Sequence, residues 1–324
     1  MTPLLEVRDI AVRYKVRTPL FCRQRYLYAV NGISFTLEKG ETLGLVGESG
    51  CGKSTLGRAL VKLETPYRGG ILLDGRDLVT ARGKELKELR KKFQMIFQDP
   101  YGSLNPRLNI FSALDEVIAL HFPGSRSQRL ERAAELMEKV GLSPEALSRY
   151  PHQFSGGQRQ RIGIARALAA EPEFIVADEP VSALDVSVQA SIVNLLQDIQ
   201  KESGTALLFI AHDLAVVEHI STRIMVMYLG NAVELAPSRQ LAASPRHPYT
   251  QALLNAVPNL DKRDRHLPHL TGDVPSPLAP PAGCPFHPRC PYASEQCRKE
   301  KPFLQELPGE AGRFCACWHP LTNV

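Results

Sequence analysis

The sequence has no apolar run of about 18 residues, so nothing in it predicts a helix that spans a membrane. Its first residues also lack the basic segment followed by a long apolar segment that marks a secretory signal. Internal repeats, low-complexity tracts and sustained heptads are missing as well, which excludes repeat proteins and long coiled coils. We therefore expect a globular protein that stays in the cytosol.

Blocks of like charge are missing too. The 39 Lys and Arg residues exceed the 34 Asp and Glu residues by a net charge of +5, and they are spread along the 324 residues. A solvated surface explains this distribution better than a nucleic-acid interface, so we expect no nucleic-acid partner. A mild basic excess also suits a protein that docks near an anionic membrane leaflet.

Cysteine is scarce in most of the chain, where only Cys22 and Cys51 occur before position 284. The other five cysteines lie between Cys284 and Cys317, and in a reducing cytosol such a cluster predicts a metal or iron–sulfur site before it predicts disulfides. Proline is concentrated similarly, with 15 prolines among the 88 residues from Pro237 onward. Because proline lacks an N–H donor and fixes one torsion, we expect residues 237–324 to form an irregular extension that needs a staple.

Hydrophobic patterning before Pro237 predicts an α/β domain. Alternating apolar residues and short continuous apolar runs indicate strands, whereas apolar residues three or four apart indicate helices. The expected strands are 4–14, 30–46 (including a buried run at 42–46), 174–177 and 206–210, and the expected helices are 54–63, most of 106–170, and one carrying Ile192, Leu195, Leu196 and Ile199. Strands that alternate with helices predict a mainly parallel core with a helical insertion.

Residues 47–54 (Gly-Glu-Ser-Gly-Cys-Gly-Lys-Ser) match the phosphate-loop pattern between a predicted strand and a predicted helix. Glycines let successive backbone N–H groups turn toward phosphate oxygens, and the following helix N-terminus favours an anion. Lys53 would reach the β- and γ-phosphates, and the Ser54 hydroxyl would bind Mg²⁺. The residues expected to bind ATP and Mg²⁺ are Ser49, Gly50, Cys51, Gly52, Lys53, Ser54 and Thr55.

Two further segments suit the same chemistry. The buried strand 174–177 is followed by Asp178 and Glu179, at the sheet edge where we expect the phosphate loop. Asp178 would hold Mg²⁺, and Glu179 would orient and deprotonate the attacking water. Residues 154–158 (Phe-Ser-Gly-Gly-Gln) open a predicted helix, so Ser155, Gly156, Gly157 and Gln158 form a second helix start suited to an anion.

Taken together, the order of these motifs resembles that of the nucleotide-binding subunits of ATP-binding-cassette (ABC) transporters. The resemblance covers residues 4–236 and adds the segments 182–185 (Ser-Ala-Leu-Asp) and 211–213 (Ala-His-Asp). It implies a RecA-like phosphate-loop ATPase core with antiparallel β and helical subdomains. The implied domains are 1–236, with a helical insertion at about 106–165, and an irregular cysteine-rich extension at 237–324.

The resemblance also assigns roles to individual residues. Gln98 would sense Mg²⁺ and the attacking water, and His212 would contact the γ-phosphate. Asp185 would belong to the loop that couples the two sites of a dimer. Tyr14 would stack on adenine, although Tyr26 or Tyr28 could serve instead because residues 15–28 look inserted. The signature at 155–158 would complete the ATP site of a facing subunit.

The extension narrows the resemblance to oligopeptide and dipeptide importers, on the segments 244–254 and 272–278. In that family such a cysteine set holds a [4Fe–4S] cluster, which implies Cys284, Cys290, Cys297 and Cys317 as ligands. Cys317 is preferred to Cys315 because the family pattern places alanine before the cysteine. From the residues alone, zinc and unligated thiols remain open, but the spacing is not that of a zinc ribbon. His287 is better read as a loop residue, and Cys22 and Cys51 need no metal role.

The implied function is that of the motor subunit of an importer for short peptides. Its implied partners are a second ABC ATPase of related sequence, two transmembrane permease subunits and an extracytoplasmic solute-binding protein. It would sit peripherally on the cytoplasmic face of the inner membrane, with its helical insertion and residues 99–106 facing the permeases. The alternatives are the same role for nickel or another small solute, and, more remotely, a soluble ABC ATPase of DNA repair or translation.

Overall fold

The computed structural model describes residues 3–17, 24–182, 184–256 and 272–322. It divides into two compact units, which are described separately. Unit 1 comprises Met1–Leu4, Leu37–Glu41 and Thr80–Ile210, and unit 2 comprises Leu5–Thr36, Thr42–Val79 and Ala211–Val324. Within the described ranges no helix is both long and apolar enough to cross a membrane.

Unit 1 is built on three parallel strands in the order β8-β7-β6. These strands are β6 (Phe93–Ile96), β7 (Phe174–Asp178) and β8 (Ala206–Ile210), and every residue of β7 and β8 is buried. Burial on both faces explains why they read as continuous apolar runs rather than as alternating patterns. The two buried strands expected here are therefore confirmed.

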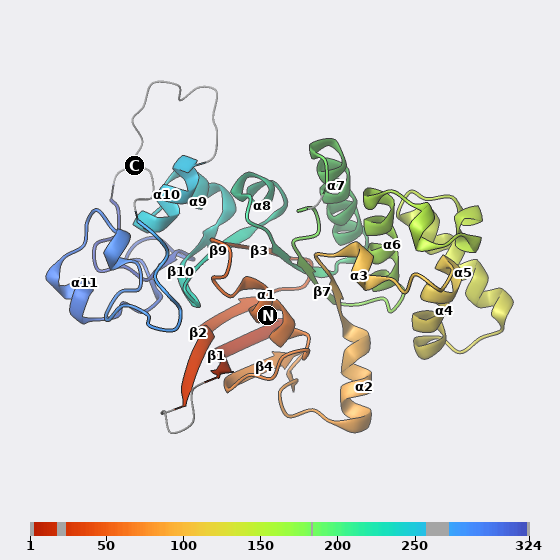
Figure 1. The fold of residues 1–324 in the computed structure, drawn as a ribbon, viewed down its shortest axis with the longest axis horizontal. Coiled ribbons are helices and arrows are strands. Elements are labelled where there is room, and N and C mark those ends of the chain that lie inside the picture. The colour runs from red at the N-terminus through yellow and green to blue at the C-terminus, as the bar shows by residue number, and fades with distance from the viewer. Residues whose placement is uncertain (1–2, 18–23, 183, 257–271, 323–324) are drawn as a thin grey trace. The chain divides into compact units, whose positions relative to one another are not determined.

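Helices make up most of the remainder of unit 1 (Figure 1). They are α2 (Gly83–Lys92), α3 (Pro100–Ser103), α4 (Ile110–His121), α5 (Arg126–Lys139), η1 (Pro144–Ser148), η2 (Pro151–Gln153), α6 (Gly156–Leu168) and α7 (Val186–Ser203). Side-chain caps fix several starts: Asn109 caps α4, and Ser125 with Gln128 forms a capping box at α5. The expectation that residues 106–170 are mostly helical is confirmed.

Unit 2 contains an antiparallel β region and a second set of strands. The first set has the order β2-β1-β4-β5 and is formed by β1 (Leu5–Val16), β2 (Arg25–Leu37), β4 (Arg68–Leu73) and β5 (Arg76–Asp77) (Figure 1). The second has the order β11-β12-β10-β9-β3 and is formed by β3 (Thr42–Val46), β9 (Arg223–Tyr228), β10 (Asn231–Pro237), β11 (Gln305–Glu306) and β12 (Phe314–Cys315). β3 pairs with β9 in parallel, and β9 pairs with β10 in antiparallel orientation.

The helices of unit 2 are short. They are α1 (Lys53–Leu60), α8 (Leu214–Ile220), α9 (Ser238–Ala243), α10 (Pro248–Ala256), η4 (His287–Arg289) and α11 (Glu295–Lys299). The prediction that the first helix reaches position 63 is wrong, because α1 ends at Leu60. Lys62 has φ of 51°, in the left-handed region that breaks a right-handed helix. Its Nζ instead donates to the carbonyl oxygens of Leu78 and Val79.

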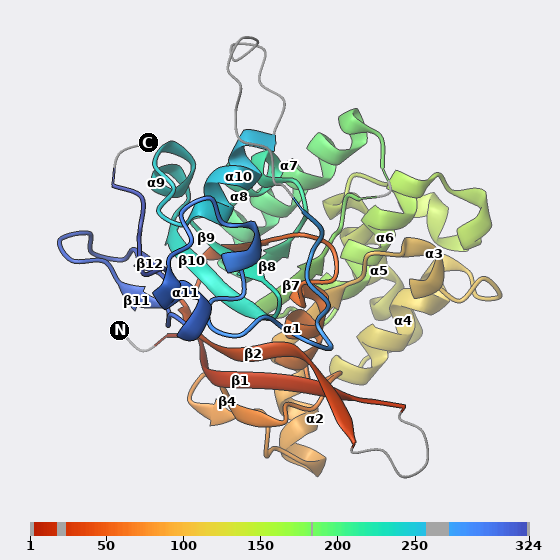
Figure 2. The same cartoon turned by 60° about the vertical axis from the view of Figure 1, so that its left-hand side comes forward.

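The C-terminal extension, residues 237–324, is held to unit 2 by strand pairing and aromatic packing. β12 pairs with β10, so the extension continues the strand order of β3, β9 and β10 (Figure 2). Tyr249 and Phe286 are fully buried and pack on Tyr228, with ring centroids 4.7 to 5.3 Å apart. Burying these rings stabilises a proline-rich segment that contains little regular structure.

His247 lies at the base of this packing and is 1% exposed. Its backbone N–H donates to the Glu234 carboxylate at 2.9 Å, and its Nδ1 accepts the backbone N–H of Tyr249 at 3.0 Å. Burial lowers the pKa of His247 to about 3 from an ordinary value of 6.5. The folded chain therefore keeps His247 neutral at pH values where the unfolded chain binds a proton.

This difference predicts a loss of stability in acid. The free energy of unfolding should fall by about 2 kcal/mol from this residue alone between about pH 7.5 and about pH 5, because protonation favours the unfolded state in that window. In His247→Asn, whose side-chain oxygen can still accept the Tyr249 N–H, this part of the pH dependence should vanish. Urea unfolding of both proteins at the two pH values checks it, and parallel pH profiles would contradict it.

Candidate functional site

The phosphate loop connects β3 to α1 and follows a path that only glycine permits at two points. Gly47 and Gly52 have φ of 153° and 107°. A Cβ atom at Gly47 would lie 2.2 Å from the Met227 carbonyl oxygen, and one at Gly52 would lie 2.0 Å from that of Ala29. Neighbouring backbone therefore leaves no room for a Cβ at Gly47 or Gly52. A Cβ at Gly50 would meet no atom within 4 Å.

Lys53 is 4% exposed at the start of α1. Its Nζ donates to the carbonyl oxygens of Gly47 at 2.7 Å and Glu48 at 3.2 Å, so the ammonium lies inside the curve of the loop. Ser49 and Gly50 are exposed at the tip, and Ser54 and Thr55 are half-buried on α1. Cys51 is a buried residue of the loop itself, and burial raises the pKa of its thiol.

Tyr14 lies on β1 and is 37% exposed. Burial raises the pKa of its hydroxyl, which interacts with the side chain of Thr55 on the helix that follows the phosphate loop. Tyr26 and Tyr28 contact Arg13 instead: the Arg13 guanidinium lies 4.0 Å from the Tyr26 ring centre and bonds to the Tyr28 hydroxyl at 3.4 Å. Adjacent residues of a strand point to opposite faces, so this contact favours Tyr14 as the tyrosine beside the loop.

In unit 1, Asp178 ends β7 and is 2% exposed, and Glu179 follows it with φ of 45°. A positive φ in a residue with a side chain is strained and typical of functional sites. The backbone N–H of Glu179 bonds to the Ile210 carbonyl at 2.9 Å, which holds this turn. Its carboxylate accepts a 2.8 Å hydrogen bond from the Gln98 side chain, so the structure brings together two residues that the sequence places 81 positions apart.

The signature segment begins α6. Ser155 and Gln158 form a capping box, in which the Gln158 N–H donates to the Ser155 hydroxyl at 3.3 Å and the Ser155 N–H to the Gln158 side chain at 3.0 Å. Capping alone therefore explains the serine and the glutamine, without the anion site that this segment predicts. Gly157 has a packing reason, because a Cβ there would lie 2.5 Å from the Val188 side chain of α7, whereas a Cβ at Gly156 would make only an ordinary contact with Leu184.

Asp185 and His212 lie at helix starts. Asp185 precedes α7 and is exposed, and its backbone carbonyl accepts the Gln189 N–H at 2.8 Å. His212 is exposed immediately before Asp213, whose side chain caps α8. Both are placed where an exposed side chain could reach a ligand or a partner.

Four of the clustered cysteines line one small cavity in the extension. They are Cys284, Cys290, Cys297 and Cys317. Burial, with an added contribution from the other three thiols, raises the pKa of Cys317 to about 12. Cys315 does not line this cavity; it lies on β12 opposite Glu234. Within the described residues no group of three or more His, Cys, Asp or Glu side chains is arranged to hold a metal ion. Cys22 lies outside the described residues.

Comparisons with known proteins agree with these motifs. The family model of the ABC transporter matches residues 30–182, and that of the oligopeptide/dipeptide transporter C-terminal region matches residues 233–297. The "Probable peptide ABC transporter ATP-binding protein y4tS" of Sinorhizobium fredii (strain NBRC 101917 / NGR234) is 54% identical over 97% of this chain and 89% of that protein. The dipeptide transport ATP-binding protein DppF of Haemophilus influenzae is 48% identical over 98% of this chain and 97% of that protein.

The chain belongs to the ATP-binding proteins of ABC transporters. A solved structure agrees: the dimeric ATP-binding cassette MJ0796, in a post-hydrolysis state with ADP and Pi, matches with a TM-score of 0.65 and 28% identity over 72% of this chain and 99% of that chain. The unmatched part of this ABC protein is consistent in size with its C-terminal extension.

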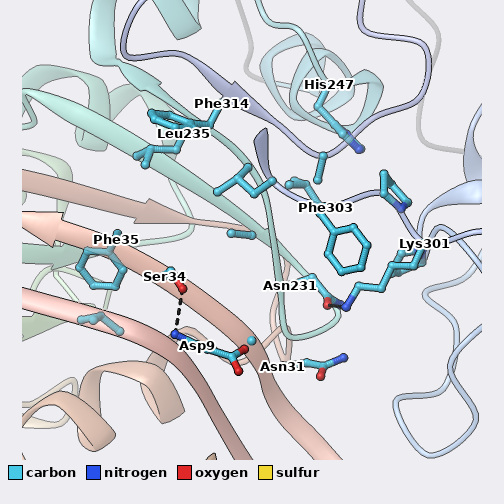
Figure 3. Close-up of a pocket in the computed structure, with 18 of the residues that line it drawn as sticks. Asp9, Asn31, Ser34, Phe35, Asn231, Leu235, His247, Lys301, Phe303 and Phe314 are labelled. Carbon is cyan, nitrogen blue, oxygen red and sulfur yellow. Dashed lines mark hydrogen bonds between the residues drawn. The ribbon is translucent and has the colours of Figure 1, made fainter. Parts of the chain in front are cut away.

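Unit 2 of this ABC protein also contains a cavity of about 620 Å³, which no phosphate-loop residue lines (Figure 3). Its walls come from β1, β2, β10 and the extension, and include Phe35, Leu235 and Phe303. The Lys301 ammonium donates to the Asn231 side chain at 2.6 Å on one side of it. The cavity therefore lies where the extension packs on the strands, separate from the ATP-binding motifs.

The position of Lys53 generates a direct test. Lys53→Ala should raise the Kd for ATP at least on the order of a hundredfold, because it removes the only side-chain cation that the loop encloses among the described residues. Equilibrium titration with a fluorescent ATP analogue measures it. Arg58→Ala, an exposed change at the end of the same helix, is the matched control and should bind normally. Wild-type affinity in Lys53→Ala would overturn the phosphate-loop assignment.

Proposed function

We propose that this protein is the ATP-hydrolysing motor subunit of an importer for short peptides. The observation that carries the proposal is the pairing of a phosphate loop with a C-terminal region that matches the oligopeptide/dipeptide transporter model. Relatives of nearly the same length are named for peptide and dipeptide transport, which supports the choice of substrate class. Nickel or another small solute is the alternative cargo, since cargo contacts belong to other subunits.

The residues of this chain supply binding, orientation and proton transfer. Lys53 and the loop amides would bind the β- and γ-phosphates, and Tyr14 would stack on adenine. Glu179 would accept the proton of the attacking water as its oxygen bonds to the γ-phosphorus and the bond to the β-phosphate oxygen breaks, giving ADP and phosphate. The 2.8 Å bond from Gln98 supports this role because it orients the Glu179 carboxylate.

The donor set also suits Mg²⁺, which would neutralise charge developing on the transferred phosphoryl group. Ser54 would supply a hydroxyl ligand from α1. Asp178 and Gln98 would supply oxygen ligands from unit 1, and hard oxygen donors are those that Mg²⁺ prefers. His212 would contact the γ-phosphate.

A second ATPase subunit and membrane partners complete the proposal. The exposed start of α6 at Ser155 would bind the nucleotide of a facing subunit together with Gly156, Gly157 and Gln158, and Asp185 would couple the two sites. The dimer would dock on two permease subunits at the cytoplasmic face of the inner membrane, with a solute-binding protein on the other side. The helical insertion of unit 1 would receive the permeases.

Glu179→Gln tests the motor role. In the complex assembled with its partners, the variant should bind ATP normally while ATP hydrolysis and uptake of a labelled dipeptide fall 10²- to 10⁴-fold, because the amide keeps the shape and loses the base. ATPase assays and uptake by proteoliposomes measure both. A loss of less than about tenfold would mean that Glu179 is not the base.

The same vesicles separate the cargo classes. Wild-type complex should take up the dipeptide in an ATP-dependent way, and free nickel should not compete. Uptake of nickel but not of peptide would contradict the peptide assignment and leave the motor role intact.

We also propose that Cys284, Cys290, Cys297 and Cys317 bind one [4Fe–4S] cluster of structural role. The support is that these four thiols line one cavity, and four thiolates are the usual ligand set of such a cluster. When bound, the cluster would crosslink four points of an irregular segment, which stabilises its fold. The thiols themselves would orient inward from the segments on either side of η4, from α11 and from the segment after β12.

The cysteine proposal predicts brown protein with about four iron atoms per chain after anaerobic purification, the content of a cubane cluster. Cys317→Ser should lose the colour, because it removes one ligand. Cys315→Ser is the matched control and should keep it, since Cys315 does not line the cavity. Iron analysis and visible absorbance measure both. Colourless protein with one zinc per chain, or loss of iron in Cys315→Ser alone, would contradict the assignment.

A further inference from the structure

Two side chains of the C-terminal extension contact the phosphate loop at the same residue, Glu48. The Arg289 guanidinium donates two hydrogen bonds to the Glu48 carboxylate, at 2.7 and 3.0 Å. The Tyr249 hydroxyl accepts the backbone N–H of Glu48 at 2.9 Å. The loop is therefore fixed at its second residue through both its side chain and its backbone.

This contact is largely shielded from water. The Arg289 side chain is 5% exposed and the Glu48 side chain is 24% exposed. Burial raises the pKa of Tyr249, so the phenol stays neutral. A two-bond guanidinium–carboxylate pair in such surroundings is stronger and more directional than an exposed pair.

The pair matters for nucleotide binding because of the charge it neutralises. Glu48 lies between Gly47 and the exposed tip of a loop that must accept a polyanion, and the Lys53 ammonium bonds to its carbonyl oxygen. A carboxylate left without Arg289 would repel the phosphates and compete for Lys53. The bond from the Glu48 N–H to the Tyr249 hydroxyl also holds the backbone of the loop at this residue.

We propose that Arg289 and Tyr249 are positioning residues for ATP, so that the affinity of the phosphate loop depends on the C-terminal extension. The inference rests on the proposed ATP-binding role. Arg289 directly precedes Cys290, and nearby Phe286 packs against both Tyr228 and Tyr249. The ordered cysteine segment thereby holds the guanidinium at the loop.

The test is a double-mutant cycle on the full-length protein, with ADP as the probe. Arg289→Ala should raise the Kd for ADP on the order of tenfold, because it leaves an uncompensated carboxylate near the phosphates. Glu48→Gln should change the Kd little, since it removes the charge together with the need for a partner. Adding Glu48→Gln to Arg289→Ala should restore most of the lost affinity, a rescue that a merely structural role of Arg289 would not produce.

In the assembled complex, Arg289→Ala should raise the KM for ATP and leave kcat nearly unchanged, because it does not alter the base. Lys299→Ala, which breaks the exposed ion pair of Lys299 with Glu295 in the same extension, is the matched control and should leave the Kd unchanged. Thermal unfolding without nucleotide identifies any variant that fails to fold. An unchanged Kd in a folded Arg289→Ala, or a double variant as weak as Arg289→Ala, would overturn the proposal. Failure of the wild type to bind ADP would instead refute the proposed function.

Discussion

The close approach of backbone to backbone at Gly47 and Gly52 is the constraint on which the ATP-binding region depends. At both positions a neighbouring carbonyl oxygen occupies the space that a Cβ would need, and both backbone angles lie where glycine alone is comfortable. The buried strand β3 delivers the chain to this point, and α1 carries it away with Lys53 as its first residue. The Lys53 ammonium is therefore held inside the curve of the loop, where the proposed phosphates would bind.

Local features of this fold were predictable because they depend on neighbours in sequence. Strands β7 and β8 read directly as apolar runs, since burial on both faces leaves no polar alternation. The end of α1 was not predictable, because apolar Leu63 continued the helical spacing while the left-handed backbone at Lys62 ended the helix. Ser155 and Gln158 show the converse: their spacing marked a helix start correctly, but a capping box accounts for it without any ligand.

Long-range pairings could not be predicted from spacing. The Gln98–Glu179 bond was not predicted, because nothing local to either residue names its partner. The spacing of the cysteines did not distinguish Cys315 from Cys317, and only the family pattern favoured Cys317. In the structure, Cys315 pairs opposite Glu234 in β12, whereas Cys317 lies past the strand and lines the cavity. Arg289 and Glu48 lie 241 positions apart, and the only hint of their contact in the sequence is that Arg289 stands beside Cys290.

The contacts at Glu48 connect the C-terminal extension to the phosphate loop. As sequence, it is a proline-rich segment that needs a staple, and the proposed cluster would supply one. As structure, it already has a packed base, formed by buried Tyr249, Phe286 and His247. Tyr249 of this base and the nearby Arg289 are the two residues that contact Glu48. Ordering the cysteine segment would therefore affect the phosphate loop as well as the extension. Arg289 and the buried ring of Phe286 belong to this segment, and Arg289 pairs with the Glu48 carboxylate.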